Sequence, residues 1–284
     1  MLIDYKVDRT EDCALMNVNN WISTSDIVSQ NIKGKLSISC ITEILEENFK
    51  EDYGVHKGDY VLITKVASDI AVMRSYSLTD NSKYFNLPIS QIIGRFKGNN
   101  VSLTSLELLK GKVLIEKVTN TDSYLYLPET SDMVGKVIKV NSGIDSIREN
   151  GLILLKDNII TPIRLDGKEY FAADDTNVVG VISHDGIKFI NESILMVPYV
   201  SPYVLGSELL VSPTIDYENL DYSDIYNRDL FQIKFLDENL IDFKKDDIIL
   251  VRRDLTTYVY IDDNKYFLLN GKKWVEAKLE GKKG

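Results

Sequence analysis

The chain has 284 residues, a net charge of −10 and a hydrophobic fraction of 44%. At roughly 100–200 residues per domain, this length suits two or three domains, and the apolar content, which includes 16 Tyr and 9 Phe, excludes a largely disordered chain. The acidic balance argues against nucleic acid as a partner, because phosphate contacts need clustered Lys and Arg.

The N-terminal sequence and the cysteines indicate a cytoplasmic protein. The stretch MLIDYKVDRTEDC lacks the basic start and apolar core of a signal peptide, and no run approaches the ~18 apolar residues of a membrane span. Neither Cys13 nor Cys40 belongs to a CxxC pair. Two buried free thiols are the expected state, and a bond between adjacent strands is the alternative.

Short apolar runs that alternate with polar residues predict strands along most of the chain. These runs are rich in β-branched and aromatic residues, as at 112–118, 135–140, 231–236 and 256–262. The best helical signal is ITEILEENFKEDYG at 41–54, where Ile44, Leu45 and Phe49 would share a face or form a single helical turn in a loop.

The predicted elements repeat three times in the same order. Opening strands are expected at 13–19, 112–118 and 193–200, second strands at 34–41, 135–140 and 229–236, third strands at 56–63, 155–163 and 244–252, and closing strands at 83–96, 168–182 and 265–279. Turns into the third strand start at Lys57, Lys156 and Lys245, and Tyr-Phe pairs start at Tyr84, Tyr170 and Tyr266. Such order predicts three small β-barrels with irregular loops, at 1–98, 99–190 and 191–284.

The middle copy resembles the GroES-type co-chaperonins. It reads VLIEKV at 113–118, a polar loop with the apolar centre Leu125-Tyr126-Leu127-Pro128, GKVIKVNSG at 135–143 and KEYFAADDTNVVGVI at 168–182. KGDYVLI at 57–63 and GSELLVSP at 206–213 are similar to the family's turn and to its apolar loop tract. The resemblance implies an all-β fold of three tandem GroES-like barrels. It also implies a co-chaperonin function, in which mobile apolar loops dock on a chaperonin ring.

Eight residues are candidates for partner binding, because exposed apolar residues in loops often mark an interface. They are Trp21, Ile22, Leu125, Tyr126, Leu127, Leu209, Leu210 and Val211. The alternative is that they cover their own barrel. The partners are predicted to be proteins, namely a chaperonin ring or assembly neighbours, and the chain is predicted to form a homo-oligomer without nucleic acid or membrane.

A second function stays open, because the family's ring has seven copies of the module and seven is not a multiple of three. In this alternative the chain is a structural assembly protein, for example a phage virion component, that reuses the module as a building block. It would then lie in a host cytoplasm or in a virion.

No residue is predicted to be catalytic or to bind a metal or a cofactor. His56 and His184 lie beside turns, far apart in sequence, and the acidic pairs Asp174-Asp175, Asp246-Asp247 and Asp262-Asp263 lack the spacing of a calcium loop. Phosphate-cradling glycine motifs and a nucleophile elbow are missing from the sequence. The sequence therefore favours a protein without enzymatic activity.

Overall fold

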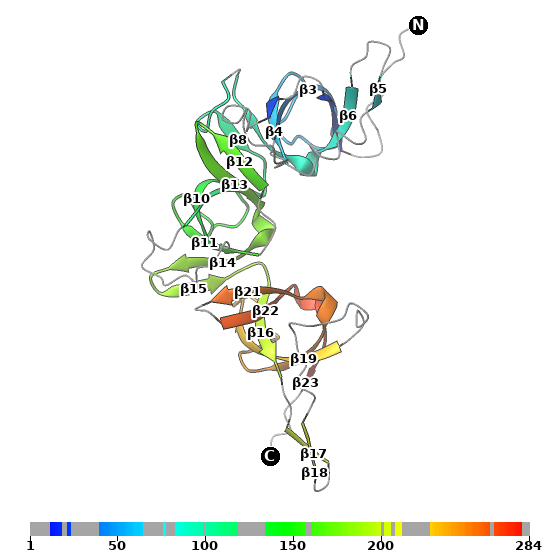
Figure 1. The fold of residues 1–284 in the computed structure, drawn as a ribbon, viewed down its shortest axis with the longest axis vertical. Helices are drawn as coiled ribbons and strands as arrows, with labels where there is room; N and C mark the ends of the chain where they lie inside the picture. The colour runs from blue at the N-terminus through cyan, green and yellow to red at the C-terminus, as the bar shows by residue number, and fades with distance from the viewer. Residues whose placement is uncertain are drawn as a thin grey trace, which may run out of the picture. The chain divides into compact units, whose positions relative to one another are not determined.

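The fold consists of antiparallel strands, short 3-10 helices and turns (Figure 1). The computed structural model describes residues 12–18, 22–23, 40–64, 76–77, 83–98, 100–118, 134–156, 161–199, 202–205, 208–211, 228–261 and 264–279. In these ranges there is no α-helix, so the predicted all-β class is confirmed. An apolar helix of membrane-spanning length is likewise not found in them.

The chain gathers into two compact units. One unit comprises residues 1–117, 136–151 and 159–175, and the other comprises 118–135, 152–158 and 176–284. The predicted boundaries at 1–98, 99–190 and 191–284 stay a prediction.

Three large antiparallel sheets hold nearly all strands. The first has the order β5-β6-β1-β3-β4-β7-β8, the second β12-β13-β9-β10-β11-β14-β15 and the third β21-β22-β16-β19-β20-β23. The strands on this path of the first sheet are β1 (Cys13–Asn17), β3 (Cys40–Asn48), β4 (Tyr60–Ile63), β5 (Tyr76–Ser77), β6 (Lys83–Pro88), β7 (Ile92–Phe96) and β8 (Leu106–Leu108), and an eighth strand, β2 (Ile22–Ser23), pairs with β3 off the path. Those of the second are β9 (Lys112–Lys117), β10 (Val134–Asn141), β11 (Leu152–Leu155), β12 (Thr161–Leu165), β13 (Lys168–Asp174), β14 (Val178–Ser183) and β15 (Gly186–Phe189). Those of the third are β16 (Ser193–Pro198), β19 (Arg228–Leu236), β20 (Ile248–Arg252), β21 (Thr257–Ile261), β22 (Asn264–Asn270) and β23 (Val275–Leu279).

The three sheets have the same connectivity. When the strands are numbered along the chain from β1, β9 and β16, leaving out β2, β17 and β18, each sheet has the order fourth, fifth, first, second, third and sixth strand. A seventh strand, β8 or β15, follows at the edge of the first two sheets. A 3-10 helix separates the fifth strand from the sixth every time: η2 (Ile89–Gln91), η3 (Asp175–Asn177) and η6 (Lys272–Trp274). The structure therefore repeats one arrangement of strands three times.

Closed barrels are not observed. Each sheet is an open path of strands within the described residues, although Figure 1 shows the strands of the first sheet curling toward one another. The structure shows three large antiparallel sheets, and their closure into barrels stays a prediction.

The Tyr-Phe pairs occupy equivalent positions in the fifth strands. Phe85 lies opposite Met16, Phe171 opposite Ile115 and Phe267 opposite Met196, and these three partners lie at the same place in the first strands. Phe85 and Phe267 pack against apolar clusters, whereas the Phe171 ring lies under Lys117, whose Nζ is 4.7 Å from the ring centroid.

The turns into the third strand correct one prediction. Each turn is closed by the same three backbone hydrogen bonds of 2.7–3.1 Å, centred on Gly58, Asn150 and Asp246. These three residues have φ values of 89°, 65° and 70°. Lys57 and Lys245 precede two of them, as predicted, but Lys156 follows the third strand of its sheet instead. The equivalent residue in the second sheet is Glu149.

The helical signal at 41–54 is also wrong. Residues 40–48 form β3, which is the second strand of the first sheet, whereas the sequence predicts that strand at 34–41. Its apolar residues serve two different clusters: Ile44 packs with Met16 and Val61, whereas Ile41 packs with Leu62. Apolar residues on both faces of a strand, at irregular spacing, produce the i, i+3, i+4 pattern that is typical of a helix. Residues 40–48 form a strand because they pair with β1 and β4.

The apolar clusters are of two kinds. One kind lies within a single sheet, as around Met16 in the first and around Phe231 in the third. The other kind joins consecutive sheets within one compact unit, and we call these clusters junctions. In the first junction, Leu62, Ile93, Phe96, Leu106 and Leu108 pack with residues of the second sheet, which are Leu114, Ile163, Leu165, Tyr170 and Ala172. In the second junction, Leu154, Val179, Ile182 and Phe189 pack with residues of the third sheet, which are Leu195, Val259 and Leu268.

Candidate functional site

The connection between the first and second strands is the longest in each of the three sheets. It spans 18–39 in the first sheet, 118–133 in the second and 199–227 in the third. The connectivity of the sheets thus gives all three connections the same topological place. All eight residues predicted to bind partners belong to these connections, which makes them the candidate docking elements.

In their described residues, the first and third connections contain short strands. In the first, β2 (Ile22–Ser23) pairs with β3, so that Ile22 lies opposite Ile41. In the third, β17 (Pro202–Leu205) and β18 (Glu208–Val211) form a separate two-stranded hairpin. The predicted tract Leu209, Leu210 and Val211 is therefore a strand of this hairpin rather than irregular loop. Trp21, Leu125, Tyr126 and Leu127 lie outside the described residues.

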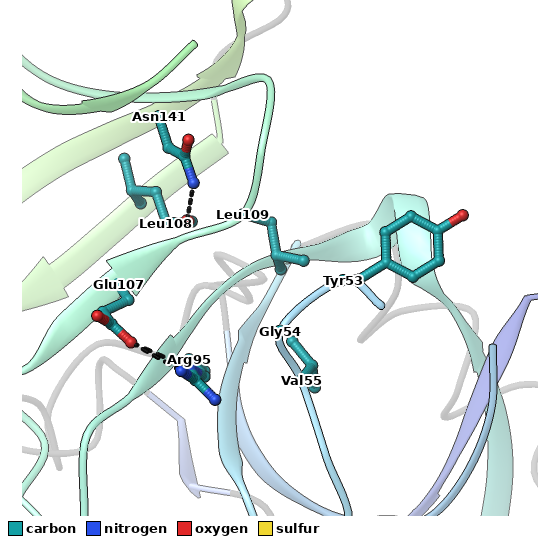
Figure 2. Close-up of a pocket in the computed structure, with 8 residues that line it drawn as sticks. All are labelled: Tyr53, Gly54, Val55, Arg95, Glu107, Leu108, Leu109 and Asn141. Atoms are coloured by element: carbon teal, nitrogen blue, oxygen red, sulfur yellow. Dashed lines mark hydrogen bonds and ion pairs between the residues drawn. The ribbon is translucent and has the colours of Figure 1, made fainter. Parts of the chain in front are cut away.

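A cavity of about 220 Å³ lies in the first compact unit (Figure 2). Its lining residues are Tyr53, Gly54, Val55, Arg95, Glu107, Leu108, Leu109 and Asn141. Figure 2 shows the Arg95 side chain directed at Glu107 and the Asn141 amide directed at the backbone of Leu108.

The polar groups of this cavity are engaged with one another. Arg95 donates to Glu107 at 3.1 Å and lies 3.4 Å from a carboxylate oxygen of Asp59. The Asn141 amide donates to the carbonyl oxygen of Leu108 at 2.7 Å. These contacts tie β7 to β8 and β8 to the end of β10, and the charge of Arg95 is balanced by the carboxylates of Glu107 and Asp59.

Two cationic side chains bond the carboxylate of Glu107. Lys97 and Arg95 bond its carboxylate at 2.5 and 3.1 Å, and these hydrogen bonds lower its pKa against the opposing effect of partial burial. A bond from Arg252 likewise lowers the pKa of Asp254, and burial alone lowers the pKa of Lys156. None of these groups faces another as an acid-base pair would.

The lowered pKa of Glu107 predicts a pH dependence of stability. A carboxyl group whose pKa is lower in the folded chain stabilises it above the ordinary pKa of about 4.3, and this stabilisation disappears as the pH falls through the folded-state value. We expect wild-type protein to lose more stability than Glu107→Gln between pH 7 and pH 3, as measured by denaturant titration. Glu238→Gln, at an exposed turn, is the matched control. Parallel losses in wild-type and Glu107→Gln protein would contradict the prediction.

His56 has partners that the sequence did not reveal. Its Nδ1 lies 3.3 Å from Glu47 Oε1 and its Nε2 lies 3.9 Å from Asp52 Oδ1. Glu47 lies in β3, and His56 precedes β4, so the chain between these two paired strands brings side chains nine residues apart together. His184 lies 3.1 Å from the carboxylate of its neighbour Asp185, and both side chains are exposed. Groups of three or more side chains suited to a metal ion are not found in the described part of the chain.

Neither the protein-family models nor the curated proteins compared with this sequence gave a match. The function is therefore inferred from the repeated connectivity and from the three equivalent connections.

Proposed function

We propose that the chain is a non-enzymatic docking protein that presents three equivalent loops to a multi-site protein partner, as a co-chaperonin presents loops to a chaperonin ring. The observation that carries the proposal is the identical place of the longest connection in all three sheets. The tandem repeat keeps this place constant while the connections differ in sequence and length.

Three linked docking elements suit a partner with repeated sites. A loop that becomes ordered on binding loses conformational entropy, so each contact alone is weak and reversible. Linking contacts in one chain turns the second and third into intramolecular events and raises the overall affinity by about 10²–10⁴ where the geometry allows simultaneous binding. A weak loop contact repeated three times therefore gives firm but releasable attachment.

The test is co-migration with a chaperonin ring in native mass spectrometry and size-exclusion chromatography, with and without nucleotide. We expect a complex of defined stoichiometry that forms only in the presence of nucleotide. Absence of a complex with ring proteins from several sources would contradict the chaperonin as the partner.

A second function, that of a structural assembly protein, is favoured by a different observation. Each compact unit contains one junction, and both junctions use equivalent apolar positions in the third and sixth strands, with the seventh strand at their edge. A contact used twice with the same positions is typical of a building block. With this function the purified chain would assemble with itself, without a chaperonin, into particles of uniform mass.

A further inference from the structure

One face of the first and fifth strands is used in both junctions. Strand pairing aligns three pairs of residues on it, which are Leu15 with Asn86, Leu114 with Ala172, and Leu195 with Leu268. The pairs of the second and third sheets belong to the first and second junctions, where residues of the preceding sheet cover them. We call the equivalent surface of the first sheet, formed by Leu15, Tyr84 and Asn86, the receiving face.

The receiving face is buried, although no sheet precedes it in the described residues. Leu15 is only 4% exposed, and Cys13, which belongs to the same cluster, is 2% exposed. In the described part of the chain, the apolar side chain that packs against these two is that of Tyr84. The side-chain oxygen of Asn86 is also buried, and no donor among the described residues bonds it. A further segment is therefore needed to cover this face, and its polar groups could reach the oxygen of Asn86.

In both junctions the seventh strand of the preceding sheet takes part in this covering, and it lies directly before the first strand in sequence. Leu106 and Ile187 lie six residues before the start of β9 and β16, and both contribute to their junctions. Leu108 and Phe189 lie four residues before the same starts and do likewise. The spacing between the covering residues and the first strand is thus the same in both junctions.

The segment before β1 has the pattern of such a strand. Because β1 begins at Cys13, the same two spacings fall on Val7 and Arg9. Apolar residues alternate with charged ones from residue 3 to residue 8, which is typical of a strand with one apolar side. The residue that directly follows each fifth strand donates a backbone hydrogen bond of 2.7–3.2 Å to the carbonyl oxygen of the residue before the first strand, which is Asp12, Gly111 or Glu192.

Charge complementarity gives Arg9 a partner on the first sheet. Strand pairing places Glu46 and Phe235 at the same position of their second strands, each opposite the leucine of the aligned pairs. In the second junction, the rings of Phe235 and Phe189 have their centroids 5.5 Å apart. Arg9 and Glu46 have the positions of these two rings, so that a cation and an exposed carboxylate replace a ring pair.

We propose that residues 3–9 form a strand that lies across the receiving face of their own chain, with the apolar side toward Leu15 and with Arg9 beside Glu46. Residues 3–9 lie outside the described residues, and their place is inferred from the positions that they would meet. The strand would keep the receiving face closed to other proteins, including a second copy of the chain. The proposal does not depend on the docking function, since the three long connections take no part in it.

Backbone amide exchange in the full chain, followed by mass spectrometry, tests this interaction. We expect residues 3–9 to be protected in the wild-type protein. Val7→Asp should speed exchange there by at least about tenfold, because burial of a Val side chain changes an equilibrium by more than that factor. Exchange in β22 should stay unchanged, which shows that the variant folds. Unprotected residues 3–9 in the wild-type protein would overturn the proposal.

An exchange of charges tests the position of the strand. Arg9→Glu should speed exchange in residues 3–9 by about two- to fivefold, as expected for a surface ion pair, and Glu46→Arg should restore protection in the double variant. Lys6→Glu is the matched control, because it makes the same change of charge on the other side of the strand and should leave exchange unchanged. Equal effects of Arg9→Glu and Lys6→Glu, or a double variant without recovery, would also overturn it.

The dependence on protein concentration identifies the chain that supplies the strand. A contact within one chain gives the same protection of residues 3–9 in dilute and in concentrated protein. Protection that increases with concentration, together with a larger mass in size-exclusion chromatography, would overturn the proposal in favour of the same segment from a second copy.

Discussion

Replacing Gly94 by alanine is expected to lower the free energy of unfolding by about 1–3 kcal/mol, the range for atoms forced into well-packed space. The new methyl group would overlap the carbonyl oxygen of Glu107 and lie 3.0 Å from Leu106 Cδ1. Because a backbone oxygen cannot rotate away, β8 must shift as a whole. That shift would disturb the first junction, to which Leu106 and Leu108 belong.

Gly143→Ala is the matched control for this prediction. Gly143 lies in an exposed turn, a Cβ atom added to it would meet nothing within 4 Å, and it does not need a positive φ. Its replacement should be neutral or stabilising by about 0.4–1 kcal/mol, because alanine restricts the unfolded chain. Denaturant titration measures both variants, and amide exchange should show faster opening of β8 only in Gly94→Ala. Equal stability of the two variants would contradict the prediction, because it would mean that the close approach of β8 to Gly94 leaves room for a side chain at that position.

The repeated order of elements could be predicted from sequence because most strands are bounded by clear signals. Alternating apolar residues and the Tyr-Phe pairs mark strands whose rings fill equivalent places. The error in the second sheet comes from Lys156-Asp157, which imitates the Lys-Asp turns elsewhere. A better signal is Asn150-Gly151, since Asn tolerates the left-handed backbone that this turn requires.

The junctions could not be predicted, because they depend on which residues face outward after the sheets have formed. Leu62 and Leu154 read simply as strand residues, and only the register shows that each packs with the following sheet. The meaning of Gly94 and Gly180 likewise depends on the seventh strand that crosses them. The partner-binding tracts within the long connections could be proposed from sequence, because apolar residues between predicted strands are a local signal.

The largest effect on binding is expected from Leu209→Ala combined with Leu210→Ala. These residues lie in β18 of the third connection, whose hairpin is a separate sheet from the one formed by β16, β19 and β20. If they dock in a partner groove, the double variant removes about 2–4 kcal/mol of apolar burial. At 1.4 kcal/mol per tenfold change in affinity, binding should weaken by roughly 30- to 1,000-fold.

Stability separates docking from packing in this experiment. If the two side chains serve a partner rather than their own module, the thermal midpoint of the double variant should stay close to that of wild-type protein. Ile241→Ala is the control, because Ile241 is an aliphatic residue that is 85% exposed outside the connections. It should change neither binding nor midpoint. Titration calorimetry gives the affinity and scanning calorimetry gives the midpoint. A lower midpoint with unchanged affinity would mean that Leu209 and Leu210 cover their own module, because truncation of core residues costs stability rather than association.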